Sequence, residues 1–290
     1  MRWGDLRNSD NVEDRRGSGF RMPGGGGGLG IGGLIVVGLI AWATGIDPRI
    51  LLTGAELVTG GSQQQQAQAP GQVGVPEDET GKFVSSILGS TEQAWTDIFS
   101  QNGQRYEKPR LVLFNGATNT ACGLGQTAMG PFYCPEDQRV YLDTSFFNDL
   151  ETRFRAPGDF ARAYVIAHEI GHHVQNLLGI LPRANEERQR SSRAQANAIS
   201  VQIELQADCF AGVWGNYVNK RGNIIEPGDV EAALAAATAI GDDRLQKEAQ
   251  GRVVPDSFTH GSSAQRVRWF RRGMESGSPK DCNTFAATQL

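Results

Sequence analysis

An apolar run at residues 160–178 constrains the fold of this chain more than any other feature. Its apolar positions fall on most sides of a helix, which predicts a helix that is largely buried. Gly179 follows at the position where a glycine often ends a helix. The same helix carries His168 and His172, and a buried imidazole costs free energy unless another group pairs with it. The fold therefore has to bring partners for these histidines into its interior.

His168 and His172 are four residues apart, so both side chains project from one face of the helix. That spacing lets both imidazoles reach a single Zn²⁺ ion at about 2.0–2.1 Å. Glu169 is rotated by about 100° from His168. From there it can take a proton from a water on the metal, whose pKa Zn²⁺ lowers to about 7. Gly171 leaves space for a substrate or a neighbouring helix. The alternative, two unrelated histidines in a core, would leave both unpaired. We therefore expect one catalytic zinc ion, with His168 and His172 as ligands and Glu169 as the base.

A catalytic zinc site needs a third protein ligand. The extended three-histidine motif would need glycine at 175 and histidine at 178, where this chain has Gln175 and Leu178. A long helical pattern, roughly residues 184–219, contains Glu204 and Asp208 on one face. We expect Glu204 to complete the metal site and Asp208 to accept the second N–H of a ligand histidine. The alternative is a solvated acidic pair, which the apolar positions around it disfavour.

The fourth histidine, His260, lies in a loop before a helical segment that carries Arg266. Either side chain could donate a hydrogen bond to the oxyanion formed when a carbonyl is attacked. They could equally be a surface histidine and one arginine of a solvated basic face, and the residues alone leave both possibilities open. His173 is expected to pack in the interior, or to contact a metal ligand without binding the metal itself.

The first part of the chain differs in composition from the rest. Residues 1–28 are polar and glycine-rich, which predicts a disordered arm. Residues 29–46 are uncharged and just long enough to cross a hydrocarbon layer of roughly 30 Å, which predicts a transmembrane helix. Residues 47–81 are rich in glycine, glutamine and proline and predict a flexible linker. The folded domain is then expected to span residues 82–290.

Arginines predict the orientation in the membrane. Most of those near the apolar stretch precede it, and only Arg49 closely follows it. By the positive-inside rule, the N-terminus is expected in the cytoplasm and the domain in the periplasm or outside the cell. A cleaved signal peptide is the alternative, because Ala41-Trp42-Ala43 has the form of a cleavage site.

The chain has four cysteines, Cys122, Cys134, Cys209 and Cys282, all within residues 82–290. Cys122 and Cys134 bracket a glycine-rich segment that would fold back as a hairpin, so we expect them to pair. Cys209 with Cys282 would then clamp the C-terminal tail. Buried, reduced thiols are the alternative. No pair has the spacing of a structural zinc site.

Four blocks of this sequence together resemble the neutral zinc metallopeptidase family: residues 130–135, 168–175, 204–209 and 260–266. The resemblance implies an α+β, mostly helical, zincin-like domain of the gluzincin type, with a small sheet above the motif helix and one N-terminal transmembrane helix. The block with Glu204 and Asp208 and the block from His260 to Arg266 also look like those of membrane metalloproteases that process prenylated proteins or act in bacterial membrane quality control. That likeness implies that His260 and Arg266 lie at the active site. These membrane metalloproteases have proline where this chain has Gly261, and several apolar spans where it has one, so their kinship is distant.

Short strands are predicted at residues 110–114, 140–142 and 125–133, and residues 126–129 could hold a substrate backbone as an edge strand. A net charge of −4 gives no indication of nucleic acid as a partner. The expected function is a membrane-anchored zinc endopeptidase that acts on proteins or peptides outside the cytoplasm. The alternatives are an inactive zinc-stabilised envelope scaffold and a zinc amidase for cell-wall peptides. Glu169 favours an enzyme over a scaffold, and nothing in the sequence separates peptidase from amidase.

Overall fold

Both faces of the strand β3 (Arg110–Phe114) are buried, because its alternate residues point to opposite sides of a sheet. Leu111 and Leu113 pack into the main hydrophobic core with the helices. Val112 and Phe114 pack on the other face, in a smaller cluster that includes Tyr141. Such a strand belongs in the middle of a sheet, and that is where β3 lies.

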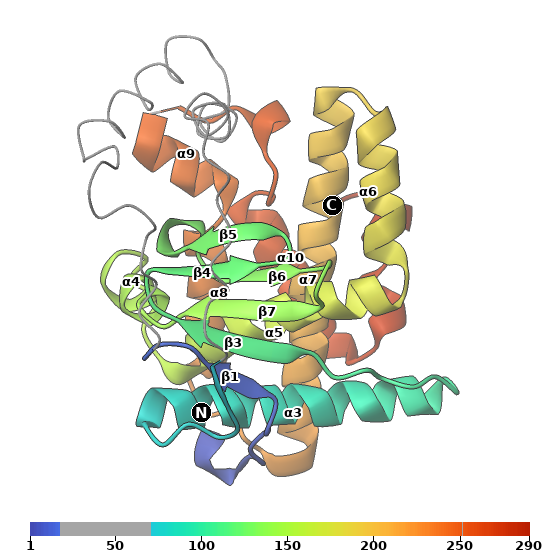
Figure 1. Ribbon diagram of the computed structural model, residues 1–290. Coiled ribbons are helices and arrows are strands. Elements are labelled where there is room, and N and C mark those ends of the chain that lie inside the picture. The colour runs from blue at the N-terminus through green and yellow to red at the C-terminus, as the bar shows by residue number, and fades with distance from the viewer. Residues whose placement is uncertain (18–70, 251) are drawn as a thin grey trace, which may run out of the picture. The chain divides into compact units, whose positions relative to one another are not determined.

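The structure is a computed structural model that describes residues 1–17, 71–250 and 252–290 (Figure 1). The described residues belong to one compact unit of the predicted α+β class. The other strands are β1 (Val12–Asp14), β2 (Gln72–Val73), β4 (Ala117–Thr120), β5 (Gly123–Gln126), β6 (Phe132–Cys134) and β7 (Arg139–Asp143). The helices are α3 (Glu79–Gln101), α4 (Phe146–Thr152), α5 (Asp159–Leu177), α6 (Ile180–Arg190), α7 (Arg193–Gly222), α8 (Asp229–Ala239), α9 (Asp242–Gln250) and α10 (Ser263–Ser276).

The main sheet has the strand order β2-β1-β3-β7-β6. Its three inner strands are parallel, and β2 and β6 run antiparallel at the two edges. Strands β4 and β5 form a separate hairpin. Helix α5 contacts β6 and β7 on one side and α7 and α8 on the other, so it lies between the sheet and the helical part of the unit (Figure 1). This arrangement places the predicted motif helix next to an edge strand.

Helices α7 and α10 lie so close that their backbones touch. A Cβ atom at Gly212 on α7 would lie 2.1 Å from the carbonyl oxygen of Phe270, and one at Gly273 on α10 would lie 1.9 Å from that of Cys209. Only glycine permits this approach at both positions. The contact sets the position of α10, and therefore of Arg266, against the helix that carries Glu204 and Asp208.

Both predicted disulfides are confirmed. Cys122 is bonded to Cys134, so the turn from the β4–β5 hairpin is tied to β6. Cys209 on α7 is bonded to Cys282, so the C-terminal segment is attached to the helical core.

The predicted disordered arm is wrong for residues 1–17. Strand β1 inserts between β2 and β3, with Val12 fully buried and paired with Leu111. A three-residue strand with one apolar residue gives no pattern that sequence analysis could detect. The buried carboxylate of Glu13 is stable there because it accepts hydrogen bonds from Arg15 and Arg139.

The structure describes part of the predicted linker but none of the predicted membrane helix. Residues 71–81, the described end of the linker, contain β2 and the first turn of α3, so the folded unit starts earlier than expected. The predicted transmembrane helix at residues 29–46 lies outside the described residues. Within the described ranges, no helix is both long enough and apolar enough to span a bilayer.

The long helical pattern at residues 184–219 is two helices. A break at Ser191 and Ser192 separates α6 from α7, and Ser192 caps α7 with a reciprocal bond to Gln195. Strands were predicted correctly at β3 and β7. The predicted edge at residues 126–129 is wrong, because Gln126 ends the separate hairpin and Thr127–Met129 form a 3-10 turn. The edge strand beside α5 is β6.

Candidate metal centre

Helix α5 places the buried residues His168 and Glu169 and the partly buried His172 against α7. Gly171 faces that helix. A Cβ atom added to it would lie 3.0 Å from the Cα and the carbonyl oxygen of Ala207. The glycine therefore lets a neighbouring helix approach, one of the two uses expected for it. The approach brings Glu204, less than one turn from Ala207, to the two histidines.

The ligand atoms of His168, His172 and Glu204 all lie within 4.8 Å of one another. The Nε2 atom of His168 is 3.2 Å from Glu204 Oε2, and that of His172 is 3.5 Å from Glu204 Oε1. A tetrahedral zinc ion with bonds of about 2.0–2.2 Å holds neighbouring ligand atoms roughly 3.3–3.5 Å apart. The structure thus brings the three predicted ligands together, and the spacing of each histidine from Glu204 fits zinc.

The hydrogen bonds of the histidines also fit a metal. The Nδ1 atom of His168 faces Asp208 at 2.9 Å, and that of His172 faces the side-chain oxygen of Gln175 at 2.9 Å. Both Nε2 atoms face Glu204. A neutral imidazole donates from one nitrogen only. With the proton on Nδ1, the lone pair of Nε2 would face the carboxylate of Glu204. A cation held between Nε2 and Glu204 removes that repulsion, which is the arrangement of a metal site.

The charges on these groups depend on one another. Burial by itself lowers the pKa of His168, but Asp208 and Glu204 outweigh it and raise this pKa to about 10. Burial raises the pKa of Glu204, and the two ligand histidines more than reverse this, so its carboxyl is held ionised. A cation at Nε2 would replace the extra proton of His168 and meet an anionic oxygen on Glu204.

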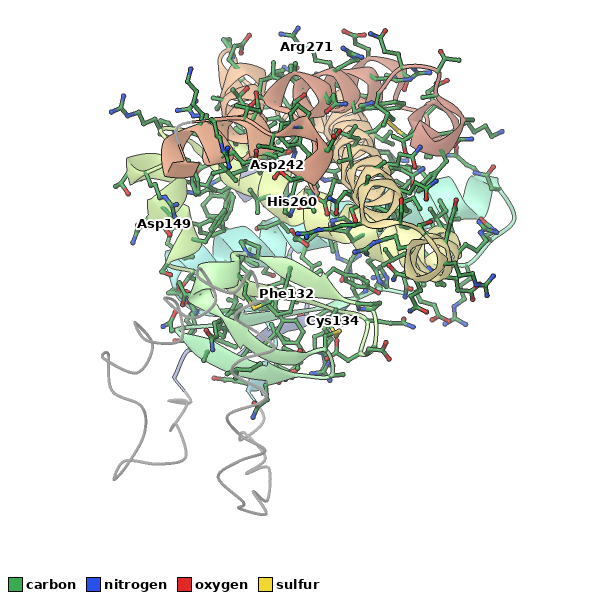
Figure 2. The ribbon with its side chains drawn as sticks, turned by 90° about the horizontal axis from the view of Figure 1, so that it is seen from above. Phe132, Cys134, Asp149, Asp242, His260 and Arg271 are labelled. Carbon is green, nitrogen blue, oxygen red and sulfur yellow. A yellow bond between two sulfur atoms is a disulfide. The ribbon has the colours of Figure 1, made fainter. Side chains whose placement is uncertain are left out.

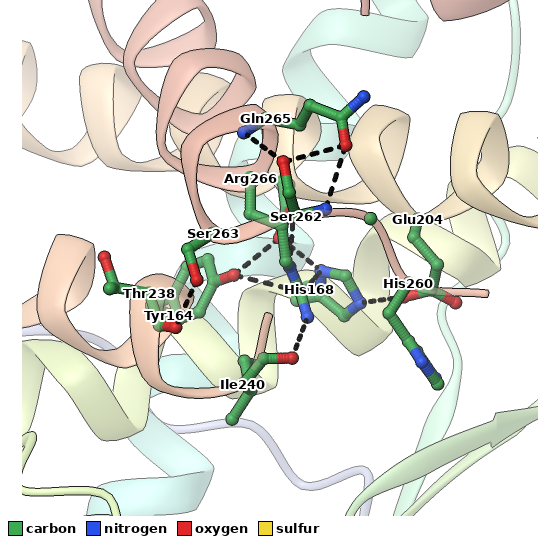
Figure 3. Close-up of polar contacts among 12 residues, drawn as sticks. Tyr164, His168, Glu204, Thr238, Ile240, His260, Ser262, Ser263, Gln265 and Arg266 are labelled. Carbon is green, nitrogen blue, oxygen red and sulfur yellow. Dashed lines mark hydrogen bonds and ion pairs between the residues drawn. The ribbon is translucent and has the colours of Figure 1, made fainter. Parts of the chain in front are cut away.

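Asp208 is the centre of a buried network that includes His168, Tyr164 and Arg266, and Figure 3 labels these three partners. Besides the bond from His168, it accepts one from the hydroxyl of Tyr164 at 2.5 Å and two from Arg266. Burial raises the pKa of Asp208, and the Arg266 guanidinium and His168 lower it further than that, so the carboxylate stays charged. The predicted contact between Asp208 and a ligand histidine is therefore present in the structure.

The expected oxyanion contact of Arg266 does not match its surroundings. Its Nε and Nη2 atoms donate to Asp208, and Nη1 lies 3.5 Å from the carbonyl oxygen of Ile240. Nη2 also lies 3.2 Å from the hydroxyl oxygen of Tyr164. All three nitrogens have partners within the protein. The structure thus places Arg266 where it orients Asp208 and, through it, His168.

His260 lies across the cleft from the sheet, beside Glu204 (Figures 2 and 3). Its side chain is about half exposed, and its Nδ1 atom is 3.2 Å from Asp242 Oδ1. Asp242 also accepts bonds from the main-chain N–H groups of Thr259, His260 and Gly261. The bond to Asp242 raises the pKa of His260 and outweighs the effect of burial. His260 is thus held through Nδ1, and its Nε2 atom has no hydrogen-bond partner among the described residues.

A cleft of about 750 Å³ opens in front of these residues. Its walls include Phe132 and Tyr133 from β6, and His260 on the opposite side (Figure 2). Glu169 lines the same cleft, and burial raises the pKa of its carboxyl. A carboxylate with a raised pKa in a cleft beside a metal site is suited to accept and release protons.

His173 is buried beneath β6. Its Nε2 atom donates to the carbonyl oxygen of Glu107 at 2.7 Å, and Nδ1 accepts from the hydroxyl of Tyr133 at 3.1 Å. Of the two expectations for His173 the structure supports packing, because its ring lies against Tyr106 and Tyr133, and its bond to Tyr133 reaches the strand beside the cleft.

Three residues of the site were missed in the sequence. Tyr164 stands four residues before His168, and Gln175 three residues after His172, so helix spacing places each beside a ligand and could have indicated them. Asp242 is remote from the motif in sequence, and no spacing rule points to it.

Comparisons with known proteins agree with this geometry. The sequence model of a family described as "putative neutral zinc metallopeptidase" matches residues 1–285. The uncharacterized protein YpfJ of Escherichia coli is 52% identical over 294 residues, which cover 98% of this chain and 99% of the relative. The uncharacterized protein Rv2575 of Mycobacterium tuberculosis is 41% identical over 264 residues, 86% of each chain. No solved structure matches the chain. The chain belongs to the putative neutral zinc metallopeptidase family.

Proposed function

We propose that this protein is a zinc endopeptidase. The observation that carries the proposal is the joint position of Glu169 and the group formed by His168, His172 and Glu204, all on one open cleft. An inactive zinc-binding scaffold has no need of an ionisable carboxyl beside the ligands or of a cleft in front of them. Membership of a zinc metallopeptidase family supports the same conclusion.

The three ligand side chains would hold the zinc ion, which when bound lowers the pKa of a water molecule and polarises a peptide carbonyl. Glu169 accepts the proton of the attacking water and delivers it to the leaving amine nitrogen. Its raised pKa favours the second transfer, because a weakly acidic carboxyl holds a proton long enough to pass it on. Asp208 keeps His168 in the tautomer that leaves Nε2 free for the metal.

His260 is the candidate donor to the oxyanion. The Nδ1–H group of His260 donates to Asp242. With that proton on Nδ1, the Nε2 atom carries a second proton only when the ring is charged. The raised pKa of His260 favours that charged form. An imidazolium at the rim of the cleft would stabilise negative charge on the carbonyl oxygen.

A peptide would bind in extended form along β6. This strand pairs only with β7 in the part of the chain that the structure describes, and Phe132 and Tyr133 line the cleft. An edge strand offers unpaired main-chain groups to a substrate backbone. The bonds of Tyr133 to His173 and Asn176 hold this edge against α5.

An oxidising compartment outside the cytoplasm is the proposed location of the folded unit. Its support is the pair of disulfides, which form and persist in such compartments. Attachment to the membrane through residues 29–46 remains part of the proposal. The N-terminal residues would share the compartment of the domain, since β1 belongs to its sheet.

The test compares full-length wild type with Glu169→Gln, which keeps the size of the side chain and removes the base. Zinc content is measured for both, and cleavage is followed by mass spectrometry on a broad peptide library that includes cell-wall peptides. We expect both proteins to bind one zinc ion and only wild type to cleave peptides. Cleavage confined to cell-wall peptides would identify an amidase. Zinc binding without cleavage of any substrate by wild type would favour the scaffold, and zinc binding unchanged in His172→Ala would show that the metal site is wrong.

A further inference from the structure

The second zinc-ligand candidate, His172, is held by a buried glutamine. Its Nδ1 atom donates to Oε1 of Gln175 at 2.9 Å, and Gln175 is fully buried. The amide nitrogen of Gln175 donates in turn to the carbonyl oxygen of Ile203 at 2.8 Å and to Oε1 of Gln206 at 3.0 Å. Both amide hydrogens of Gln175 are thereby used, so its oxygen is the atom left for His172.

The chain of hydrogen bonds continues to the C-terminal segment. Gln206, which is 3% exposed, donates from Nε2 to the carbonyl oxygen of Cys282 at 2.9 Å. Main-chain carbonyls at Cys282 and Ile203 can only accept hydrogen bonds. They therefore fix the direction of both glutamine amides. An amide oxygen facing His172 requires the proton on Nδ1 and leaves Nε2 free for the metal.

Cys282 is fully buried in the main core, where its turn packs against α7 and α10, and the disulfide adds a covalent restraint to that packing. Cys282 ends a short 3-10 turn, Pro279–Cys282, and no described helix or strand follows it beyond the 3-10 turn Thr284–Ala286. Its disulfide joins it to Cys209 on α7, across 73 residues of sequence. Nearby, the hydroxyl of Thr284 donates to the carbonyl oxygen of Gln202. A cross-link that closes so long a loop removes much of the freedom of the terminal segment.

We propose that the Cys209–Cys282 disulfide is a positioning element for the metal centre, acting on His172 through Gln206 and Gln175. The inference rests on the proposed zinc site but does not depend on which bond the enzyme cleaves. Formation of the disulfide places the Cys282 carbonyl, which orients Gln206, which with Ile203 orients Gln175. The chain with this bond reduced therefore binds zinc more weakly than the oxidised chain. Full metal affinity is reached only after the protein has been oxidised.

The second disulfide provides a matched control. Cys122 and Cys134 tie the β4–β5 hairpin to β6, and no hydrogen bond described here links either residue to His168, His172 or Glu204. A general effect of losing a cross-link would act through both disulfides. An effect through the glutamine pair would act through Cys209–Cys282 alone.

The experiment measures the zinc dissociation constant of the full-length protein by competition with a chromophoric chelator. The variants are Cys209→Ser/Cys282→Ser, Cys122→Ser/Cys134→Ser, Gln206→Leu, and Gln206→Leu combined with Cys209→Ser/Cys282→Ser. We expect the Cys209/Cys282 variant and Gln206→Leu each to weaken zinc binding by about tenfold, the low end for residues that orient a ligand. The Cys122/Cys134 variant should stay within about twofold of wild type, and the combined variant should be little worse than Gln206→Leu, because both changes break one path.

Equal losses in the two disulfide variants, or additive losses in the combined variant, would overturn the proposal. Gln206→Leu keeps both disulfides, so it tests the path even if the serine variants fail to fold, and wild-type affinity in it would also overturn the proposal. His172→Ala distinguishes failure of the proposed path from failure of the metal site itself. If it loses zinc while the path variants do not, only this inference fails. If it retains zinc, the metal site itself is wrong.

Discussion

Arg266 donates two hydrogen bonds of 2.9 Å to Asp208, from Nε to one carboxylate oxygen and from Nη2 to the other. Asp208 is fully buried and Arg266 is 2% exposed. This pair lies directly behind His168, which also bonds Asp208. The arrangement connects the last helix of the unit to a candidate metal ligand, and it makes Arg266 a positioning residue.

Replacing Arg266 with methionine should therefore destabilise the fold as well as the site. The change leaves the Asp208 carboxylate buried without its partner, which costs about 3–5 kcal/mol. Urea unfolding of the zinc-free protein measures the loss. Arg271→Met, on the exposed side of α10, should change stability by less than about 0.5 kcal/mol. An Arg266→Met protein with unchanged stability but lowered kcat would restore the oxyanion role.

Removal of the Asp242 carboxylate should shift the pH dependence of the reaction. The pKa of His260 is raised, chiefly by its bond to Asp242, so the ion pair is complete below the ordinary histidine pKa and is lost as pH rises through the raised value. Burial raises the pKa of Asp242, but the bonds from His260 lower it further, so the pair is lost at the acid end as pH falls through that lowered value. Asp242→Asn returns the pKa of His260 toward its usual range.

We expect the alkaline limb of the kcat/KM profile to move to lower pH in Asp242→Asn, with zinc affinity unchanged. Asp243→Asn is the control, since Asp243 bonds Ser263 and not His260. An NMR titration of His260 gives its pKa independently of activity. An unmoved alkaline limb would show that His260 does not act in the charged form.

A third prediction concerns Gly273, which lies where α10 contacts α7. A Cβ atom at Gly273 would overlap the carbonyl oxygen of Cys209, so Gly273→Ala must push α10 away from α7. Overpacking of this kind costs about 1–3 kcal/mol or more. The shift also moves Arg266 from Asp208, so zinc affinity should fall with stability. Gly4→Ala, where no atom lies within 4 Å of the added Cβ, should be neutral in thermal unfolding and in zinc titration.

The sequence allowed prediction of the ligands because helix periodicity places residues four apart on one face. His168 with His172, and Glu204 with Asp208, were each found by that rule, and the structure brings the two helices together. Sequence periodicity does not predict partners that only tertiary packing brings close. Asp242 bonds His260 from across a loop.

Strand β1 shows the same limit in the fold. It has no apolar alternation, and it belongs to the sheet because its main chain pairs with β3. A polar N-terminal segment was therefore expected to be disordered. Pairing with a distant strand is a property of the folded unit, and local composition does not report it.

The pairing of β1 with β3 bears on the topology of the chain. Val12 is in register with Leu111, and Asp14 with Leu113. Two strands of one sheet lie on the same side of any membrane, so a single crossing between them is incompatible with this pairing. In place of the expected separation of a cytoplasmic N-terminus from an outer domain, we therefore propose that both lie in one compartment, whether or not residues 29–46 attach to a membrane.

Single cysteines at Arg7 and Gln289, both exposed, test this directly. The native cysteines are paired in disulfides, so a membrane-impermeant maleimide should label only the added thiols. We expect both positions to be labelled equally when the outer envelope alone is permeable, because both belong to one folded unit outside the cytoplasm. Labelling of both only after the inner membrane is opened would place the unit in the cytoplasm and leave the sheet intact. Labelling of Gln289→Cys from outside and of Arg7→Cys only after opening would mean that the chain crosses the membrane between them, and the pairing of β1 with β3 would then be wrong.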